Sequence, residues 1–166
     1  MVRMAKKSAQ CRPRYGVIGI GKVGSALEHV LEYHFDVAAY DIRGSYEWEP
    51  ILETDAVFVC VQTPGGPGGR LDCTHVAAVL RRLSESRYTG VVAIRSTVAV
   101  GFMDWAVRRF SALRLVYFPE FIRERSRLAW TANPDRLVVA GARRRTTSGA
   151  HLGMSWERLR SPTMRW

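Results

Sequence analysis

The chain has 166 residues, of which 47% are hydrophobic, and its formal net charge is +10. A chain of this length is expected to form one domain whose core is large enough to fold without disulfides or metals. No apolar run approaches the ~18 residues needed to span a bilayer, and residues 1–14 lack the apolar core of a secretory signal. We therefore expect no membrane segment.

The excess positive charge lies in two tails. Residues 1–14 hold five basic side chains and no acid, and residues 143–166 hold six arginines against one acid, Glu157. Residues 15–142 keep 14 basic and 14 acidic side chains. Basic tails are usually solvated and mobile, so nucleic-acid binding is disfavoured. The three cysteines, Cys11, Cys60 and Cys73, fit no metal-binding pattern, and their odd number favours the reducing cytoplasm.

Apolar runs and amphipathic stretches alternate between residues 15 and 142. Strands are predicted at Tyr15–Ile20, Val37–Tyr40, Ala56–Val61, Val91–Ile94, Leu115–Tyr117 and Leu137–Val139, and helices at Lys22–His34, from Asp72 or Thr74 onwards, and at Gly101–Phe110. The strands are continuously apolar, which indicates burial on both faces of a parallel sheet. We therefore expect an α/β fold of the Rossmann type: a doubly wound, mostly parallel six-stranded sheet with helices on both faces.

A glycine-rich turn follows the first predicted strand and opens the first predicted helix. It has the pattern G-x-G-x-x-G and consists of Gly19, Ile20, Gly21, Lys22, Val23 and Gly24. The first glycine permits the tight turn, the second lets the backbone approach a pyrophosphate, and the third lets the helix pack closely on the strand. The free N–H groups and positive dipole end of the helix favour phosphate binding. The turn therefore predicts a dinucleotide site.

Asp41 supports this prediction because it ends the second predicted strand, 22 residues after Gly19. A carboxylate there can accept hydrogen bonds from both ribose hydroxyls and repels a 2′-phosphate, which favours NAD over NADP. Arg43 weakens this preference, since its charge can neutralise Asp41. The alternative is an ordinary glycine turn beside a surface aspartate, and the agreement of strand, turn, helix and acid argues against it.

Four further motifs follow the later predicted strands in order. They are Val61-Gln62-Thr63-Pro64, Ser96-Thr97-Val98-Ala99-Val100-Gly101, Phe118-Pro119-Glu120-Phe121-Ile122-Arg123-Glu124 and Asn133-Pro134-Asp135-Arg136-Leu137-Val138-Val139-Ala140-Gly141. With these motifs the chain resembles the NAD-binding domain of the UDP-glucose/GDP-mannose dehydrogenase family over about residues 14–142. The resemblance implies an oxidoreductase that converts the 6-hydroxymethyl group of a nucleotide sugar to a carboxylate with two NAD, in polysaccharide biosynthesis.

The resemblance also implies a role for each matching residue. Glu120 is the implied general base for thioester hydrolysis, and Thr97 is implied to orient a water or the substrate oxygen. Cofactor contacts are implied for the glycine turn, for Asp41 and, on the nicotinamide side, for Thr63, Pro64, Ser96, Thr97, Val98 and Glu124. Contacts with the sugar nucleotide are implied for Glu120, Phe121, Ile122, Arg123 and Glu124. All these segments follow carboxyl ends of predicted strands, where open parallel sheets bind ligands.

From the residues alone, Glu120 and Glu124 admit a plainer interpretation. They stand at i and i+4 in a loop and could be solvated acids that pair with Arg123, Arg125 or Arg127. Without the family resemblance we favour this interpretation. With it, the position of Glu120 after a proline and a buried strand predicts the partial burial that suits a general base.

Part of the family pattern does not occur in this chain. The family's nucleophilic cysteine lies in a G-G-x-C-x-P-K-D segment of a C-terminal sugar-binding domain, and the sequence has no such segment. Cys60 lies within a predicted strand, which favours core packing. We expect a basic N-terminal tail at 1–14, the NAD-binding domain at 15–142 and an Arg-rich tail without family resemblance at 143–166. This division suggests a truncated or frame-shifted gene product or an excised fragment.

Several functions stay open on the sequence alone. The first is the cofactor domain of a nucleotide-sugar 6-dehydrogenase, which works with NAD, a nucleotide sugar and a missing C-terminal half or partner chain. The second is a free-standing or vestigial NAD-binding module without catalysis. A basic-tailed nucleic-acid-binding protein and a hydroxyacid-type dehydrogenase are less favoured. No metal is expected, and the side of the sixth strand is expected to expose apolar surface that the missing half covers.

Overall fold

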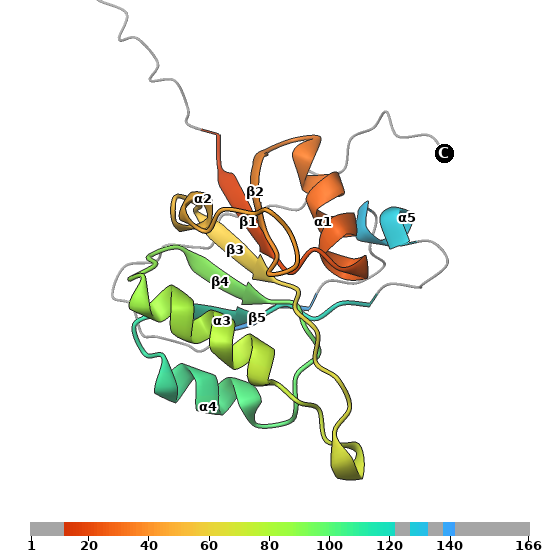
Figure 1. Ribbon diagram of the computed structural model, residues 1–166, viewed down its shortest axis with the longest axis vertical. Coiled ribbons are helices and arrows are strands. Elements are labelled where there is room, and N and C mark those ends of the chain that lie inside the picture. Colours follow the sequence, from red (N-terminus) through yellow and green to blue (C-terminus); the bar gives the residue numbers. More distant parts are fainter. Residues whose placement is uncertain (1–11, 122–126, 133–137, 142–166) are drawn as a thin grey trace, which may run out of the picture.

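A single six-stranded sheet forms the centre of the part of the chain that the computed structural model describes, residues 12–121, 127–132 and 138–141. The strand order is β2-β1-β3-β4-β5-β6 (Figure 1). The strands are β1 (Arg14–Ile18), β2 (Asp36–Tyr40), β3 (Ala56–Val59), β4 (Val91–Ile94), β5 (Arg114–Tyr117) and β6 (Ala140–Gly141). The first five are parallel, and β6 pairs antiparallel with β5. The predicted mostly parallel, six-stranded sheet is therefore confirmed.

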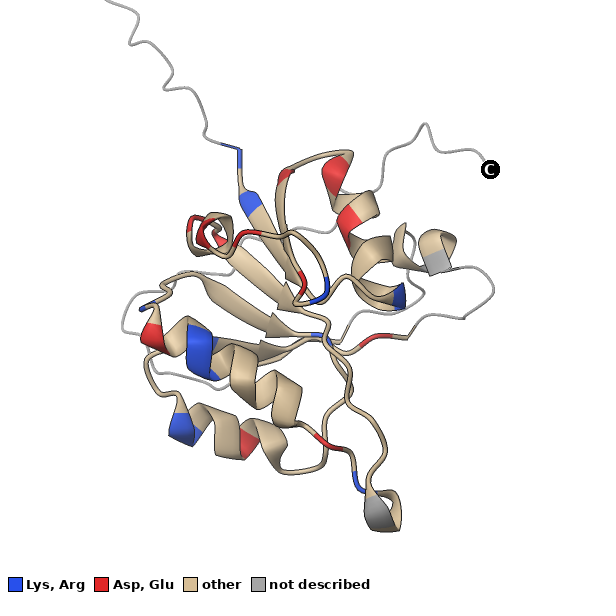
Figure 2. Ribbon diagram, viewed as in Figure 1, with Lys and Arg blue, Asp and Glu red and all other residues tan. Residues whose placement is uncertain are grey.

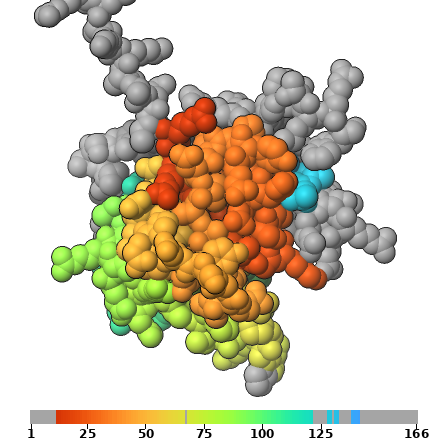
Figure 3. All heavy atoms as spheres, turned by 45° about the horizontal axis from the view of Figure 1, so that its top comes forward, coloured from red at the N-terminus to blue at the C-terminus, as the bar shows by residue number. Residues whose placement is uncertain are grey.

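Helices cover both faces of this sheet, as predicted (Figure 1). One face carries α1 (Lys22–Glu32), which packs against α5 (Arg127–Ala132). The space-filling view shows the α5 segment, in cyan, beside the orange region of α1 (Figure 3). The other face carries α2 (Glu49–Leu52), α3 (Thr74–Glu85) and α4 (Phe102–Arg109), and a 3-10 turn at Pro67–Gly69 lies in the loop before α3.

Alternate residues of the central strands point into two separate cores. Val17 and Phe58 pack with Leu27 of α1 on one face, whereas Ile18 joins Leu80 of α3 on the other. All five side chains are at most 1% exposed. Burying each such side chain contributes roughly 1.5–3 kcal/mol. Burial on both faces explains why the strands are continuously apolar in sequence.

Several strands have bounds that differ from the predicted ones. β1 ends at Ile18, two residues earlier than predicted, because Gly19 has a φ of +95° and turns the chain out of the sheet. The sixth strand is present, but its predicted bounds, Leu137–Val139, lie too early in the chain. Leu137 lies outside the described residues, and Val138 and Val139 precede β6, which pairs with β5 at Ala140–Gly141. An apolar run does not fix where an edge strand pairs.

The short helices α2 and α5 were not predicted. α2 has four residues and α5 has six, so neither repeats its apolar positions long enough to give a helical period. Acidic and basic residues are interspersed over the elements of the described chain (Figure 2). In the same ranges, no helix has the length and apolar character needed to cross a membrane.

Candidate functional site

The predicted glycine turn lies where the strand order changes direction. From β1 the chain passes to β2 on one side, and β3 lies on the other side of β1. Crevices at the carboxyl ends of strands, beside such a switch, are where open α/β sheets bind ligands. The turn is fixed to the sheet because the N–H of Gly19 donates to the carbonyl of Tyr40, at 2.8 Å.

The three glycines of the turn differ in what a Cβ atom would contact at their positions. Gly19 has a positive φ, and a Cβ there would lie 2.9 Å from the backbone of Cys60 and Val61. A Cβ on Gly24 would lie 1.9 Å from the carbonyl oxygen of Gly19. Gly21 differs, because a Cβ there would meet nothing within 4 Å, and it is the N-cap residue of α1. Gly21 therefore leaves open space in front of the helix.

Asp41 lies next to this turn and is held by it. Its Oδ2 atom accepts a hydrogen bond from the N–H of Ile20 at 2.8 Å, and its Oδ1 atom accepts one from the N–H of Arg43 at 2.9 Å. The Nε of Arg43 lies 3.3 Å from the same Oδ1. Desolvation acts to raise the pKa of Asp41, but these bonds outweigh it and hold the pKa below its ordinary value. The carboxylate is therefore an ionised acceptor at neutral pH.

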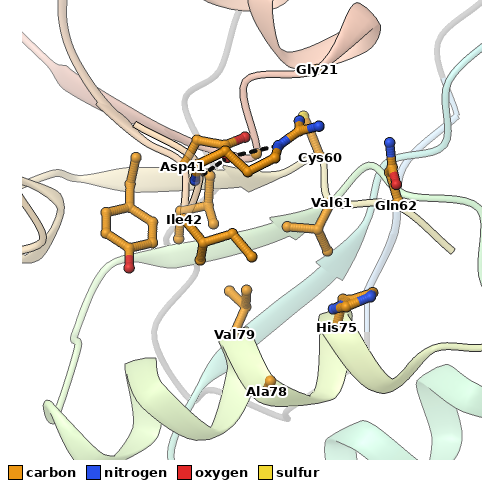
Figure 4. Close-up of a pocket in the computed structure, with 13 residues that line it drawn as sticks. Gly21, Asp41, Ile42, Cys60, Val61, Gln62, His75, Ala78 and Val79 are labelled. Atoms are coloured by element: carbon orange, nitrogen blue, oxygen red, sulfur yellow. Dashed lines mark hydrogen bonds and ion pairs between the residues drawn. The ribbon is translucent and has the colours of Figure 1, made fainter. Parts of the chain in front are cut away.

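A pocket of about 280 Å³ opens beside Asp41. Its glycine wall is formed by Gly19 and Gly21, and its other wall by Val79 and neighbouring residues of α3. Figure 4 shows Ile42 and Val61 pointing toward the side of the pocket on which Val79 lies, with Asp41 at the upper edge. The volume is near the lower limit, ~300 Å³, of small-molecule sites, so the pocket suits one end of a dinucleotide.

The segments predicted to lie on the nicotinamide side follow β3 and β4, outside this pocket. Ser96 is buried, and its hydroxyl lies 2.6 Å from the carbonyl of Val61 and 3.2 Å from that of Val59, where it holds the end of β3. Thr97, the next residue, is exposed. Thr63 and Pro64 begin the loop before α3, in which the Pro64 carbonyl accepts the N–H of Asp72 at 2.8 Å.

Glu120 forms an ion pair with Arg95, a residue that no sequence motif singled out. The side chains are 7% exposed for Arg95 and 12% exposed for Glu120. The Arg95 guanidinium also lies over the ring of Phe118, 4.9 Å from its centroid. The predicted partial burial of Glu120 is therefore present, and its described cationic partner comes from the end of β4.

Cys60 lies close to this ion pair, and its environment favours the neutral thiol. Desolvation raises the pKa of its thiol to about 12, with an opposing effect of Arg95 and a smaller reinforcing effect of Glu120. The thiol is protonated at neutral pH and packs against the core around Phe58, as the sequence suggested. Cys60 and Cys73 are both free cysteines.

Some predicted site residues fall outside the described chain, and some pocket residues were missed. Ile122, Arg123 and Glu124 lie outside the described residues, whereas Phe121 is described and about half exposed. No sequence pattern assigned a site role to the pocket residues Ile42, Val61, Gln62, His75, Ala78 and Val79. The i, i+4 spacing of His75 and Val79 places both on one face of α3, but only the packing of α3 decides that this face borders the pocket.

The residues present fit a dinucleotide at this edge of the sheet. An open N-cap glycine, a helix whose first turn holds no acidic residue and an ionised, anchored aspartate lie together. The first two suit a pyrophosphate, and the third suits the hydroxyls of a ribose.

Comparison with known proteins agrees with this geometry. The family model for the UDP-glucose/GDP-mannose dehydrogenase family, NAD binding domain, matches residues 25–154. The match therefore starts just after the glycine turn and continues past residue 142. UDP-glucose 6-dehydrogenase of Pseudomonas aeruginosa is 31% identical over 142 residues, which are 79% of this chain and 31% of that protein. The Bos taurus UDP-glucose 6-dehydrogenase is 30% identical over 106 residues, 56% of this chain and 22% of that protein.

Solved structures share the fold of this chain. A UDP-glucose dehydrogenase from Pyrobaculum islandicum superposes with a TM-score of 0.68 at 24% identity, over 84% of this chain and 43% of that one. A ternary complex of GDP-mannose dehydrogenase from Pseudomonas aeruginosa gives 0.66 at 18% identity, over 78% and 41%. The chain thus spans less than half the length of these proteins. The resemblance inferred from the motifs is confirmed.

Proposed function

Because this chain belongs to the UDP-glucose/GDP-mannose dehydrogenase family and forms its NAD-binding domain, we propose that it serves the oxidation of a nucleotide sugar. The cofactor of the domain is NAD, which accepts hydride when bound. The sugar nucleotide, the catalytic residues and the remaining part of the enzyme belong to the proposal. The observation that supports it most is the juxtaposition of the glycine turn, Asp41 and the pocket at the strand-order switch.

In this proposal the pyrophosphate lies against the glycine turn, with contacts from Gly19, Ile20, Gly21, Lys22, Val23 and Gly24. Asp41 accepts the ribose hydroxyls, and the apolar side chains of Ile42, Val61 and Val79 enclose the adenine. The nicotinamide lies toward the ends of β3 and β4, beside Thr63, Pro64, Ser96, Thr97 and Val98, and Glu124 completes that side.

Glu120 is the proposed general base, with Thr97 assisting. The two residues follow β5 and β4, which are neighbouring parallel strands, so they emerge at one edge of the sheet. The ion pair with Arg95 anchors the Glu120 carboxylate at this edge. The N–H of Phe121 donates to Glu120 Oε1 at 3.1 Å and restricts the side chain further.

A nucleotide sugar is the proposed substrate, with contacts from Glu120, Phe121, Ile122, Arg123 and Glu124. The nucleophilic cysteine and the rest of the sugar site are assigned to a C-terminal half or partner chain. Val138 and Val139, beside β6, expose about half of their surface, which suits contact with such a partner. We place the activity in the cytoplasm and in polysaccharide biosynthesis.

The proposed cofactor site predicts a clear effect of Asp41→Ala. Loss of the charge-assisted hydrogen bonds to the ribose should weaken NAD binding by about 1.5–3 kcal/mol, or roughly ten- to a hundredfold. Calorimetric titration of wild type and variant with NAD measures the difference. Asp36→Ala is the matched control, because Asp36 is an exposed aspartate at the opposite end of the same strand. That variant should bind NAD as the wild type does.

Two results would argue against the proposal at different levels. Equal NAD affinity in wild type and Asp41→Ala would remove Asp41 from the cofactor site. Normal NAD binding, but no NADH formation from UDP-glucose or GDP-mannose after the C-terminal half of the Pseudomonas aeruginosa relative has been added, would favour an NAD-binding module without catalysis. The absorbance of NADH measures this reaction.

A further inference from the structure

The acceptor sites on Asp41 are already largely occupied. A carboxylate has about four lone-pair directions, two on each oxygen. Oδ1 accepts the N–H and the Nε–H of Arg43, and Oδ2 accepts the N–H of Ile20. One direction on Oδ2 therefore remains, whereas a ribose diol brings two donors. To accept both hydroxyls, Asp41 must release one of its present partners.

The Arg43 guanidinium is the partner that can leave. The backbone N–H groups of Ile20 and Arg43 lie 2.8 and 2.9 Å from the carboxylate, and the Nε contact is the longest of the three at 3.3 Å. The Arg43 side chain is 64% exposed, while that of Asp41 is 9% exposed. Because water already solvates most of the guanidinium and the contact is long, the Arg43 side chain can leave Asp41 without being desolvated.

Once released, the guanidinium stays at the ribose end of the site. Arg43 and Asp41 both line the pocket, and the Arg43 backbone remains bonded to the carboxylate. A guanidinium presents a planar fork of donors that matches a phosphate, and it offsets the negative charge of a neighbouring carboxylate. Asp41 alone would repel a 2′-phosphate on the ribose. With Arg43 beside Asp41, the phosphate also has a cation to which it can bind.

We propose that Arg43 is a specificity-determining residue that lets this site take NADP as well as NAD. With NAD, the ribose diol replaces the guanidinium at Asp41. With NADP, the guanidinium binds the 2′-phosphate, in the role that a nearby arginine has in NADP sites of this fold. The inference rests on the proposed cofactor site and adds a second cofactor to it.

The test is calorimetric titration of the full chain with NAD and NADP. In Arg43→Ala, the Kd for NADP should rise about ten- to a hundredfold, because one charge-assisted phosphate contact is lost. The Kd for NAD should change less than about threefold, since the Arg43 side chain is 64% exposed and gives way to the ribose diol when NAD binds. Arg43→Lys keeps the positive charge but lacks the planar donor set of the guanidinium. Its affinity for NADP should therefore lie between those of the wild type and Arg43→Ala. Arg108→Ala removes an exposed arginine of α4, away from the pocket, and should alter neither affinity.

The outcomes separate the inference from the function on which it rests. NAD binding without NADP binding in the wild type, or an equal loss of both in Arg43→Ala, overturns the role of Arg43 and leaves the NAD site standing. Absence of NAD binding overturns the proposed cofactor site and the inference together. A rise in the NADP Kd alone, reversed in part by Arg43→Lys, supports the inference.

Discussion

Gly24→Ala is expected to lower the free energy of unfolding by about 3 kcal/mol or more and to abolish NAD binding. The added Cβ would lie 1.9 Å from the carbonyl oxygen of Gly19, far inside the contact distance of nonbonded carbon and oxygen. Gly19 cannot move aside, because its N–H is bonded to Tyr40 and its own Cβ position faces the backbone of Cys60. The gain in helix propensity, about 1 kcal/mol, does not offset this overlap.

Gly21→Ala in the same turn is the matched control. The φ of Gly21, −91°, suits alanine, and nothing lies within 4 Å of the new Cβ. The free energy of unfolding should therefore fall by only about 1 kcal/mol, because alanine is a poorer N-cap residue. NAD affinity should nevertheless fall at least about tenfold, because the methyl group occupies the space for the pyrophosphate. Urea unfolding and calorimetry of both variants measure the two effects. A stable Gly24→Ala protein would contradict the packing of α1 on the turn.

Arg95→Met should lower the free energy of unfolding by about 3 kcal/mol. The substitution removes the Arg95 guanidinium from Glu120, whose side chain is only 12% exposed, and so leaves a largely buried carboxylate with less charge compensation. Methionine fills much of the space beside Phe118, so loss of packing contributes less. The urea midpoint, with an unchanged m-value, measures the loss.

Two further variants test whether the effect comes from the ion pair. In Arg95→Met/Glu120→Gln no unpaired charge remains, so the double variant should be more stable than Arg95→Met alone. Arg14→Ala breaks the 2.6 Å pair of Arg14 with Glu53, whose side chains are 35% and 71% exposed. Because exposed pairs contribute little, it should cost at most about 1 kcal/mol. A double variant as unstable as Arg95→Met would assign the loss to packing.

Local patterns in the sequence determined the class of the fold and the centre of the site. The continuous apolar runs of β1 and β3 predicted a sheet buried on both faces, because each residue of such a strand must find a core on one face or the other. The glycine turn and Asp41 were predicted because each lies directly at a strand end, where a few residues of sequence fix the position. The order of the motifs predicted the family.

Only the tertiary structure decided which distant segments meet at the site. His75 and Val79 border the pocket because α3 packs across β3, and the sequence of α3 alone does not say which neighbour its faces meet. Glu120 pairs with Arg95, 25 positions earlier, because β4 and β5 pair in parallel and end at one edge. The sequence pointed to three arginines near Glu120 in the chain, and strand pairing adds a fourth that no local pattern indicated. Contacts of this kind depend on pairing and packing of whole elements, which short patterns do not encode.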